Sequence, residues 1–386
     1  MYLERMKCVL SSMALLLVLG ACKTTPDYTT ALPENVDALI PLGSKESLPD
    51  FSRQWEDRDE LLRALDQSLS WIHREHAKQF FPQAGITHKR AVASLERFGQ
   101  VLRTAFGPKD FKRAVNEDFQ VYKSAGWNGR GGGVMFTGYC TPILRGSHTY
   151  SETYCYPLYA LPEDLVKAPN GSVLGWQTRF GLQKEYPSRA AIEASNMLKG
   201  RELVWLADPI DAYLAHVNGS AFVELEDGSL FRLGYAGKNG GAYTSLAGEL
   251  IDSHKIQEAS LKAIRKWAGR SSKEEVQEYL NRNPSYVFFT PIDGTPHGSL
   301  DVPVTPGRSI ATDKSLFPRA ALTFVEGPTG QRFLNRFFFD QDTGGAIRTA
   351  GRADLYLGIG PDAEKNAGEL KVEGQMYYLF VKEPGS

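Results

Sequence analysis

The chain of 386 residues has few cysteines, almost no net charge and no long hydrophobic run. Its 44 lysines and arginines nearly balance 45 aspartates and glutamates, so nothing indicates a nucleic-acid partner. The cysteines and histidines form no cluster with metal-ligand spacing, and we expect no metal and no cofactor. Neither a G-x-S-x-G nucleophile elbow nor a complete phosphate-binding loop occurs. These absences leave carboxylates as the main candidates for chemistry.

The apolar run at the N-terminus, Val9–Leu19, is too short to span a bilayer comfortably. It follows Arg5 and Lys7 and precedes small residues, a pattern typical of a signal peptide. We therefore expect residues 1–21 to be removed on export and not to form a transmembrane helix.

The end of this segment, Leu19-Gly20-Ala21-Cys22, resembles a bacterial lipobox. A lipobox would make Cys22 the lipidated first residue of the mature chain; the alternative is an ordinary secretory signal with a chance cysteine. Residues 22–50 are polar and contain several prolines, as expected of a tether. Because Lys23 stands where an aspartate usually accompanies inner-membrane retention, we expect a lipid anchor on the periplasmic side of the outer membrane.

Two further cysteines, Cys140 and Cys155, follow Cys22. In an oxidising compartment they could pair, and their separation fits a disulfide across a hairpin or loop. Two isolated thiols fit the sequence nearly as well, so the bond stays open.

Helical and strand-like segments alternate along the chain. Apolar residues recur at helical intervals in residues 56–80 and 88–106, and helical pattern returns in residues 255–283. Short β-branched and aromatic runs fill the middle and the end, and Glu-Asp-Gly at 226–228 predicts a hairpin. This order predicts an α+β protein, mainly β, with N-terminal helices and two β units.

The segment FFFDQDTGGAIRTAGRADLYLGIG, residues 337–360, places Asp342 and Asp354 among apolar residues and glycines. Buried carboxylates are costly unless they are hydrogen-bonded or functional, so an acid/base site is one interpretation. Taken alone, Asp342 suits an Asx turn and Asp313 suits structural support. We interpret Arg308 as a structural ion-pair partner.

Several phrases occur in a recognisable order: Phe136-Thr-Gly-Tyr139, Tyr156-Pro-Leu-Tyr159, Val204-Trp-Leu-Ala-Asp-Pro209, His216-Val-Asn-Gly-Ser220, Tyr235-Ala-Gly-Lys-Asn-Gly240, Pro303-Val-Thr-Pro-Gly-Arg-Ser309, Asp342-Thr-Gly-Gly-Ala-Ile347 and Ala353-Asp-Leu-Tyr-Leu-Gly358. With the lipobox in front, they resemble the membrane-bound lytic murein transglycosylase A family. The resemblance covers roughly residues 130–382.

The resemblance implies a double-psi β-barrel domain with a second, smaller β domain inserted into it. By texture, the barrel domain comprises residues 50–141 and 285–386, with the family's 3D domain at 300–382. The insert comprises residues 142–284 and forms the other wall of a groove for a glycan strand.

The resemblance also implies an activity: cleavage of the β-1,4 bond between N-acetylmuramic acid and N-acetylglucosamine in peptidoglycan, leaving 1,6-anhydromuramic ends. The family's catalytic aspartate corresponds to Asp354, and Asp342 and Asp313 match the other two aspartates of its trio. Asp354 would protonate the glycosidic oxygen and then accept the proton of the sugar's C6 hydroxyl. Its pKa must therefore lie well above the reference of about 3.9, with Asp342 the candidate neighbour that raises it.

By the same resemblance, Thr137 and the segment Asn218-Gly219-Ser220 contact the glycan. The chain departs from the family twice: Asn218 replaces the usual glutamine, and Cys140 replaces a common second tyrosine. Two other functions stay open: a hydrolytic muramidase with a second carboxylate, and a non-catalytic wall-binding lipoprotein.

Overall fold

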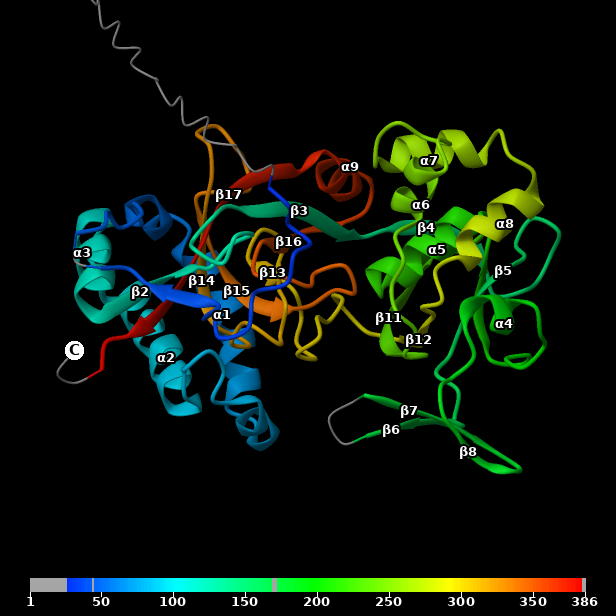
Figure 1. The fold of residues 1–386 in the computed structure, drawn as a ribbon, viewed down its shortest axis with the longest axis horizontal. Helices are drawn as coiled ribbons and strands as arrows, with labels where there is room; N and C mark the ends of the chain where they lie inside the picture. Colours follow the sequence, from blue (N-terminus) through cyan, green and yellow to red (C-terminus); the bar gives the residue numbers. More distant parts are fainter. Residues whose placement is uncertain (1–25, 44, 169–171, 384–386) are drawn as a thin grey trace, which may run out of the picture.

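The computed structural model describes residues 26–43, 45–168 and 172–383, and Figure 1 shows two β-sheet bodies side by side. The predicted signal peptide and Cys22 lie outside these ranges. None of the helices in the described ranges combines the length and apolar character that crossing a bilayer requires.

The larger sheet forms a closed barrel. Its eight strands are β1 (Leu39–Pro41), β2 (Phe119–Ser124), β3 (Val134–Thr141), β13 (Ser309–Ala311), β14 (Leu322–Glu326), β15 (Arg336–Asp342), β16 (Arg352–Ile359) and β17 (Lys371–Val381). Strand β17 pairs with both β14 and β3, so β3, β17, β14, β15, β13 and β16 close into a ring. The barrel that the resemblance implies is confirmed.

N-terminal helices cover the barrel: the short 3-10 helices η1 (Ser52–Trp55) and η2 (Glu75–Phe80), and the helices α1 (Arg58–Ile72), α2 (His88–Thr104) and α3 (Pro108–Asp118). The apolar positions of α1 and α2, such as Leu65 and Phe98, share one core with the barrel residues Phe337 and Phe339. Strands β14 and β15 are buried along almost their whole length and contain apolar runs. The helix expected over 56–80 ends earlier, at Ile72, and η2 completes the segment.

The second sheet has six strands: β12 (Val287–Pro291), β11 (Leu230–Lys238), β10 (Ala221–Glu224), β4 (Ile143–Ser147), β9 (Glu202–Leu206) and β5 (Tyr156–Tyr159). The hairpin β10–β11 turns at Gly228, which has φ +81°, as the Glu-Asp-Gly sequence predicts. A single residue, Pro142, separates β3 from β4, so the chain passes directly from the barrel into this sheet. Because β12 pairs with β11, the second sheet extends past residue 284, where the expected insert ends.

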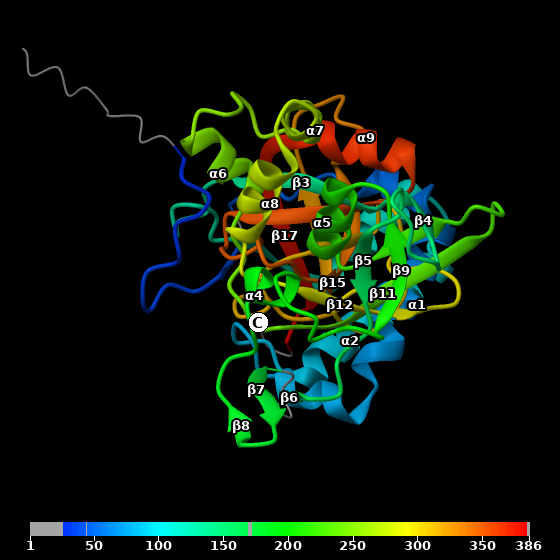
Figure 2. The same ribbon diagram turned by 90° about the vertical axis from the view of Figure 1, so that its right-hand side faces the viewer.

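The remaining helices are α4 (Arg189–Glu193), α5 (Pro209–Asn218), α6 (Leu246–Asp252), α7 (Leu261–Ala268), α8 (Lys273–Asn281) and α9 (Pro361–Glu369). A small sheet of β6 (Leu165–Lys167), β7 (Val173–Thr178) and β8 (Gly181–Gln183) projects from the second body in both views (Figures 1 and 2).

Strong capping signals set the bounds of α5. The carboxylate of Asp208 accepts hydrogen bonds from the backbone N–H groups of Ile210 (2.7 Å) and Asp211 (3.3 Å), and Pro209 starts the helix. Gly219 ends it in the left-handed conformation, φ +70°. This stop leaves Asn218 and Gly219 at a helix end facing the cavity described below.

Arg308 joins the helices to the barrel. Its guanidinium is fully buried, forms ion pairs with Asp57 and Glu60 at the start of α1, and donates to the carbonyl oxygen of Phe337 (3.1 Å). The interpretation of Arg308 as a structural ion-pair partner is confirmed.

Replacing Arg308 with leucine should lower the free energy of unfolding by on the order of 3 kcal/mol, because Asp57 and Glu60 lose their buried cation and keep only the more distant Arg336 (3.4 and 3.6 Å), and the carbonyl oxygen of Phe337 loses its donor. Urea unfolding measures this change. Arg113→Leu, which removes exposed ion pairs on α3, should change stability far less. Equal stability of the Arg308 variant and the unaltered protein would contradict the structural role of this residue.

Candidate active site

The strand register brings Asp342 and Asp354 into one row across the barrel sheet. Ala311 of β13 lies opposite Asp342 of β15 on one side and opposite Asp354 of β16 on the other. Asp354 in turn lies opposite Thr137 of β3. Neighbouring strands are about 4.8 Å apart, so the two aspartate backbones are separated by roughly two such spacings.

Asp354 is a half-buried carboxyl group with one side-chain donor. Burial raises its pKa to about 6, and the neighbouring charge of Asp342 acts in the same direction. The hydroxyl of Thr137, 2.9 Å from Oδ1 of Asp354, and the positive charge of Arg352 oppose this rise. With a pKa of about 6, the group can exchange a proton near neutral pH.

Asp342 is held by three donors. Its Oδ2 accepts from the Tyr139 hydroxyl (2.7 Å), and its Oδ1 accepts from the backbone N–H groups of Ser299 and Thr343 (2.8 Å each). Burial raises the pKa of Asp342, whereas these donors and the charge of Lys314 oppose the rise. Three donors fix the orientation of this carboxylate, in contrast to the single donor at Asp354.

Tyr139 is a site residue that sequence reasoning left without a role. It stands two positions after Thr137 on β3, so both side chains lie on one face of the strand. Its ring lies 5.2 Å from that of Tyr356, and burial raises the pKa of its hydroxyl well above the usual value. The i, i+2 spacing of Thr137 and Tyr139 in a strand is the sequence signal that could have identified Tyr139 as a site residue.

A cavity of about 870 Å³ lies beside this row and is lined by both sheets. Asp342 lines it from the barrel, and Asn218 and Gly219 line it from the second body. Asp354 and Thr137 do not line the cavity. They lie on β16 and β3, which are paired with each other further along the row. Asn218 also donates to the carbonyl oxygen of Leu214 (2.9 Å), which orients its amide.

Ser220 and Asp313 lie outside the cavity lining. Ser220 is buried, and its hydroxyl lies 3.2 Å from that of Thr141 at the junction of the two bodies. Asp313 is buried in the turn after β13, where its Oδ1 accepts from the backbone N–H (3.0 Å) and the hydroxyl (2.6 Å) of Ser315. The structure therefore brings Asp342 and Asp354 together and leaves Asp313 in a turn-stabilising position.

A further buried acid, Asp340, was not identified from the sequence. It is fully buried, forms an ion pair with Lys314 and accepts a hydrogen bond from the Tyr378 hydroxyl (2.8 Å). The charge of Lys314 also acts on Asp342, so this pair belongs to the surroundings of the site. Its position two residues before Asp342 on the same strand was the available signal.

Cys140 and Cys155 are free thiols in the structure. Cys140 is buried in β3 of the barrel, where burial raises its pKa to about 12. Cys155 precedes β5 and its backbone N–H bonds to Leu206 in the second sheet. Cys140 lies in a barrel strand and Cys155 beside the second sheet, and the structure has no bond between them.

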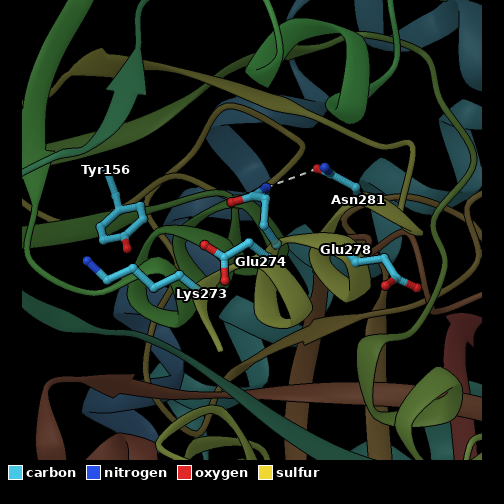
Figure 3. A pocket seen from close by; sticks show the side chains of 6 residues that line it. Tyr156, Lys273, Glu274, Glu278 and Asn281 are labelled. Carbon is cyan, nitrogen blue, oxygen red and sulfur yellow. Dashed lines mark hydrogen bonds between the residues drawn. The ribbon is translucent and has the colours of Figure 1, made fainter. Parts of the chain in front are cut away.

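A second hollow, of about 490 Å³, lies beside α8 and is shown in Figure 3. Lys273, Glu274 and Glu278 line it, and Gln277 donates to Asn281 (3.0 Å). None of the sequence-predicted site residues contributes to it, so the cavity beside Asp342 is the better candidate for chemistry.

Two family models match the chain: the MltA specific insert domain at residues 135–290 and the 3D domain at residues 308–380. Together they match more than half of the chain. Membrane-bound lytic murein transglycosylase A of Escherichia coli K12 is 34% identical over 260 residues, and that of Vibrio cholerae is 33% identical over 264 residues. These alignments span 64% and 65% of this chain and just under two thirds, 66%, of each relative.

Solved structures extend the similarity over most of the chain. A membrane-bound lytic murein transglycosylase from Agrobacterium tumefaciens has the same fold, with a TM-score of 0.75, 24% identity and coverage of 89% of this chain and 98% of that one. E. coli MltA with bound chitohexaose superposes with a TM-score of 0.67 and 25% identity, over 92% of this chain and 98% of that one.

Replacing Thr137 with valine should raise the pKa of Asp354 above its value of about 6, because the substitution keeps the branched shape and removes the donor that stabilises the carboxylate. Carboxyl NMR titration measures the shift. Thr343→Val is the matched control, since that hydroxyl donates to the carbonyl oxygen of Thr312 and not to a carboxylate. An unchanged pKa of Asp354 in the Thr137 variant would show that this hydrogen bond does not affect that pKa.

Proposed function

Because the chain belongs to the membrane-bound lytic murein transglycosylase A family, we propose that it is a lytic transglycosylase. It cleaves the β-1,4 bond between N-acetylmuramic acid and N-acetylglucosamine in peptidoglycan and forms 1,6-anhydromuramic ends. The observation that carries this proposal is the pairing of Asp354, whose pKa is about 6, with the fixed carboxylate of Asp342.

In the first step, protonated Asp354 donates its proton to the glycosidic oxygen as the bond to the muramic acid C1 breaks. Since the pKa of Asp354 is about 6, a useful fraction of the enzyme carries this proton in mildly acidic to neutral solution. Asp342, held by three donors, keeps a negative charge nearby that favours retention of the proton before the step.

In the second step, the Asp354 carboxylate accepts the proton of the C6 hydroxyl of the same muramic acid. The C6 oxygen attacks C1 and closes the 1,6-anhydro ring, so no water is consumed. Intramolecular attack can reach effective molarities on the order of 10⁵ M, which makes a second carboxylate nucleophile unnecessary. A hydrolase would instead need a positioned water or a second nucleophilic carboxylate.

The glycan strand occupies the cavity between the two sheets and extends along the row of Asp342 and Ala311 to Asp354, which lies outside the cavity lining. Support comes from the cavity of about 870 Å³ and from the chitohexaose bound to the E. coli protein. Asn218 and Gly219 contact the strand from the second body, while Thr137 acts from the barrel through its hydrogen bond to Asp354.

Replacing Asp354 with asparagine should lower the rate of anhydromuramic-end formation by about 10²- to 10⁴-fold, because the side chain keeps its size and loses its proton. Mass spectrometry of digested murein measures these ends. Asp362→Asn, which changes an exposed acid in the first turn of α9, should leave the rate unchanged. If the Asp354 variant forms anhydro ends as fast as the unaltered protein, Asp354 is not the catalytic acid. If the unaltered protein forms only reducing muramic ends, it is a muramidase.

The protein is proposed to be anchored by lipid on Cys22 to the periplasmic side of the outer membrane, which is supported by the lipobox and by the membrane-bound names of its relatives. Replacing Cys22 with alanine should move the protein from the membrane fraction to the soluble fraction, because the acyl chains provide the anchor. Immunoblots of the separated fractions measure this shift. Undiminished membrane association of the variant would contradict the lipid anchor.

A further inference from the structure

The cavity carries two cationic side chains that the proposed chemistry does not use. Lys238 ends β11 on the second sheet and is half-buried, whereas Arg348 lies in the exposed loop between β15 and β16 of the barrel. Both line the cavity beside Asp342. They therefore approach the same space from its two walls.

Neither cation has an acidic partner within the described part of the chain. Lys238 makes no ion pair or side-chain hydrogen bond there, and Arg348 donates only from Nε to the carbonyl oxygen of Gly345, at 3.4 Å. The two charges also act on each other, because burial and the charge of Arg348 both lower the pKa of Lys238.

The other charged residues around the cavity already have partners. Arg189 pairs with Glu193 (3.0 Å), and Asp301 pairs with Arg74 (3.6 Å). Asp342 accepts three hydrogen bonds and is acted on by the charge of Lys314. The positive charge of Lys238 and Arg348 is consequently left for a molecule that enters the cavity.

Two neighbouring cations, one of them half-buried, repel each other in an empty cavity. An anion bound between them offsets this repulsion. A carboxylate suits this pair, because Arg348 offers a planar set of donors and Lys238 a compact charge. A neutral chitin-type glycan offers no such group.

Building on the proposed function, we propose that Lys238 and Arg348 bind a carboxylate carried by the muramic acid residue of the substrate. In a naked strand this carboxylate belongs to the 3-O-lactyl group. In a peptide-substituted strand the lactyl carboxyl is an amide, and the carboxylates belong to the attached peptide. The pair thus selects muramic-acid-containing strands over chitin-type glycans.

Binding is measured by calorimetry in the Asp354→Asn background, so that strands are not cut. The double variant Lys238→Gln/Arg348→Gln should bind strands of alternating N-acetylglucosamine and N-acetylmuramic acid roughly tenfold more weakly. Its affinity for chitohexaose should stay within about twofold of the parent. Lys273→Gln, which removes a cation from the other hollow, is the matched control and should bind both ligands as the parent does.

Naked and peptide-bearing strands are measured separately. If the double variant loses affinity only for naked strands, the pair binds the lactyl carboxylate. If it loses affinity only for peptide-bearing strands, the pair binds the peptide carboxylates. If it loses affinity for both, the pair binds both kinds of carboxylate. Unweakened binding of both strands, an equal loss for chitohexaose, or no binding of muramic acid strands by the parent would overturn the proposal. The proposed function is tested separately: it fails if the protein with Asp354 intact produces murein digests without anhydro ends.

Discussion

The register of three barrel strands is the constraint on which the site depends. Ala311 pairs with Asp342 on one side and with Asp354 on the other, so two acids from different strands share one row. A shift of one residue in either pairing would turn one carboxyl to the opposite face of the sheet. Closure of the ring through the pairings of β17 with β14 and β3 leaves its six strands without a free edge.

Unequal hydrogen bonding gives the two acids different properties. Both are half-buried, and burial raises the pKa of each. Three donors and a nearby lysine counteract burial at Asp342, whereas Asp354 has the Thr137 hydroxyl and the charge of Arg352. One acid is thereby suited to remain a fixed charge and the other to exchange a proton, a division typical of sites that perform acid/base chemistry near neutral pH.

The second body supplies residues that line the cavity, whereas the two acids of the site stand on barrel strands. Its link to the barrel is short on one side, since only Pro142 separates β3 from β4. The capped end of α5 then presents Asn218 and Gly219 to the cavity, while Lys238 at the end of β11 adds a charge. The buried contact between Thr141 and Ser220 ties the two bodies together just behind this surface.

Much of the protein follows from local sequence. Helical periodicity located α2, the Glu-Asp-Gly turn located the β10–β11 hairpin, and ordered phrases around Asp354 led to the family. These features depend on near neighbours in the chain, so their physics is visible in the sequence. The sequence alone distinguished Asp342, as the neighbour of Asp354, from Asp313, as structural support, but it did not reveal Tyr139 as a donor to Asp342. The hydroxyl of Tyr139 on β3, the backbone N–H of Ser299 and the charge of Lys314 act on Asp342 only after the barrel closes. Tyr139 and Asp342 are 203 positions apart in the chain and must first become neighbours.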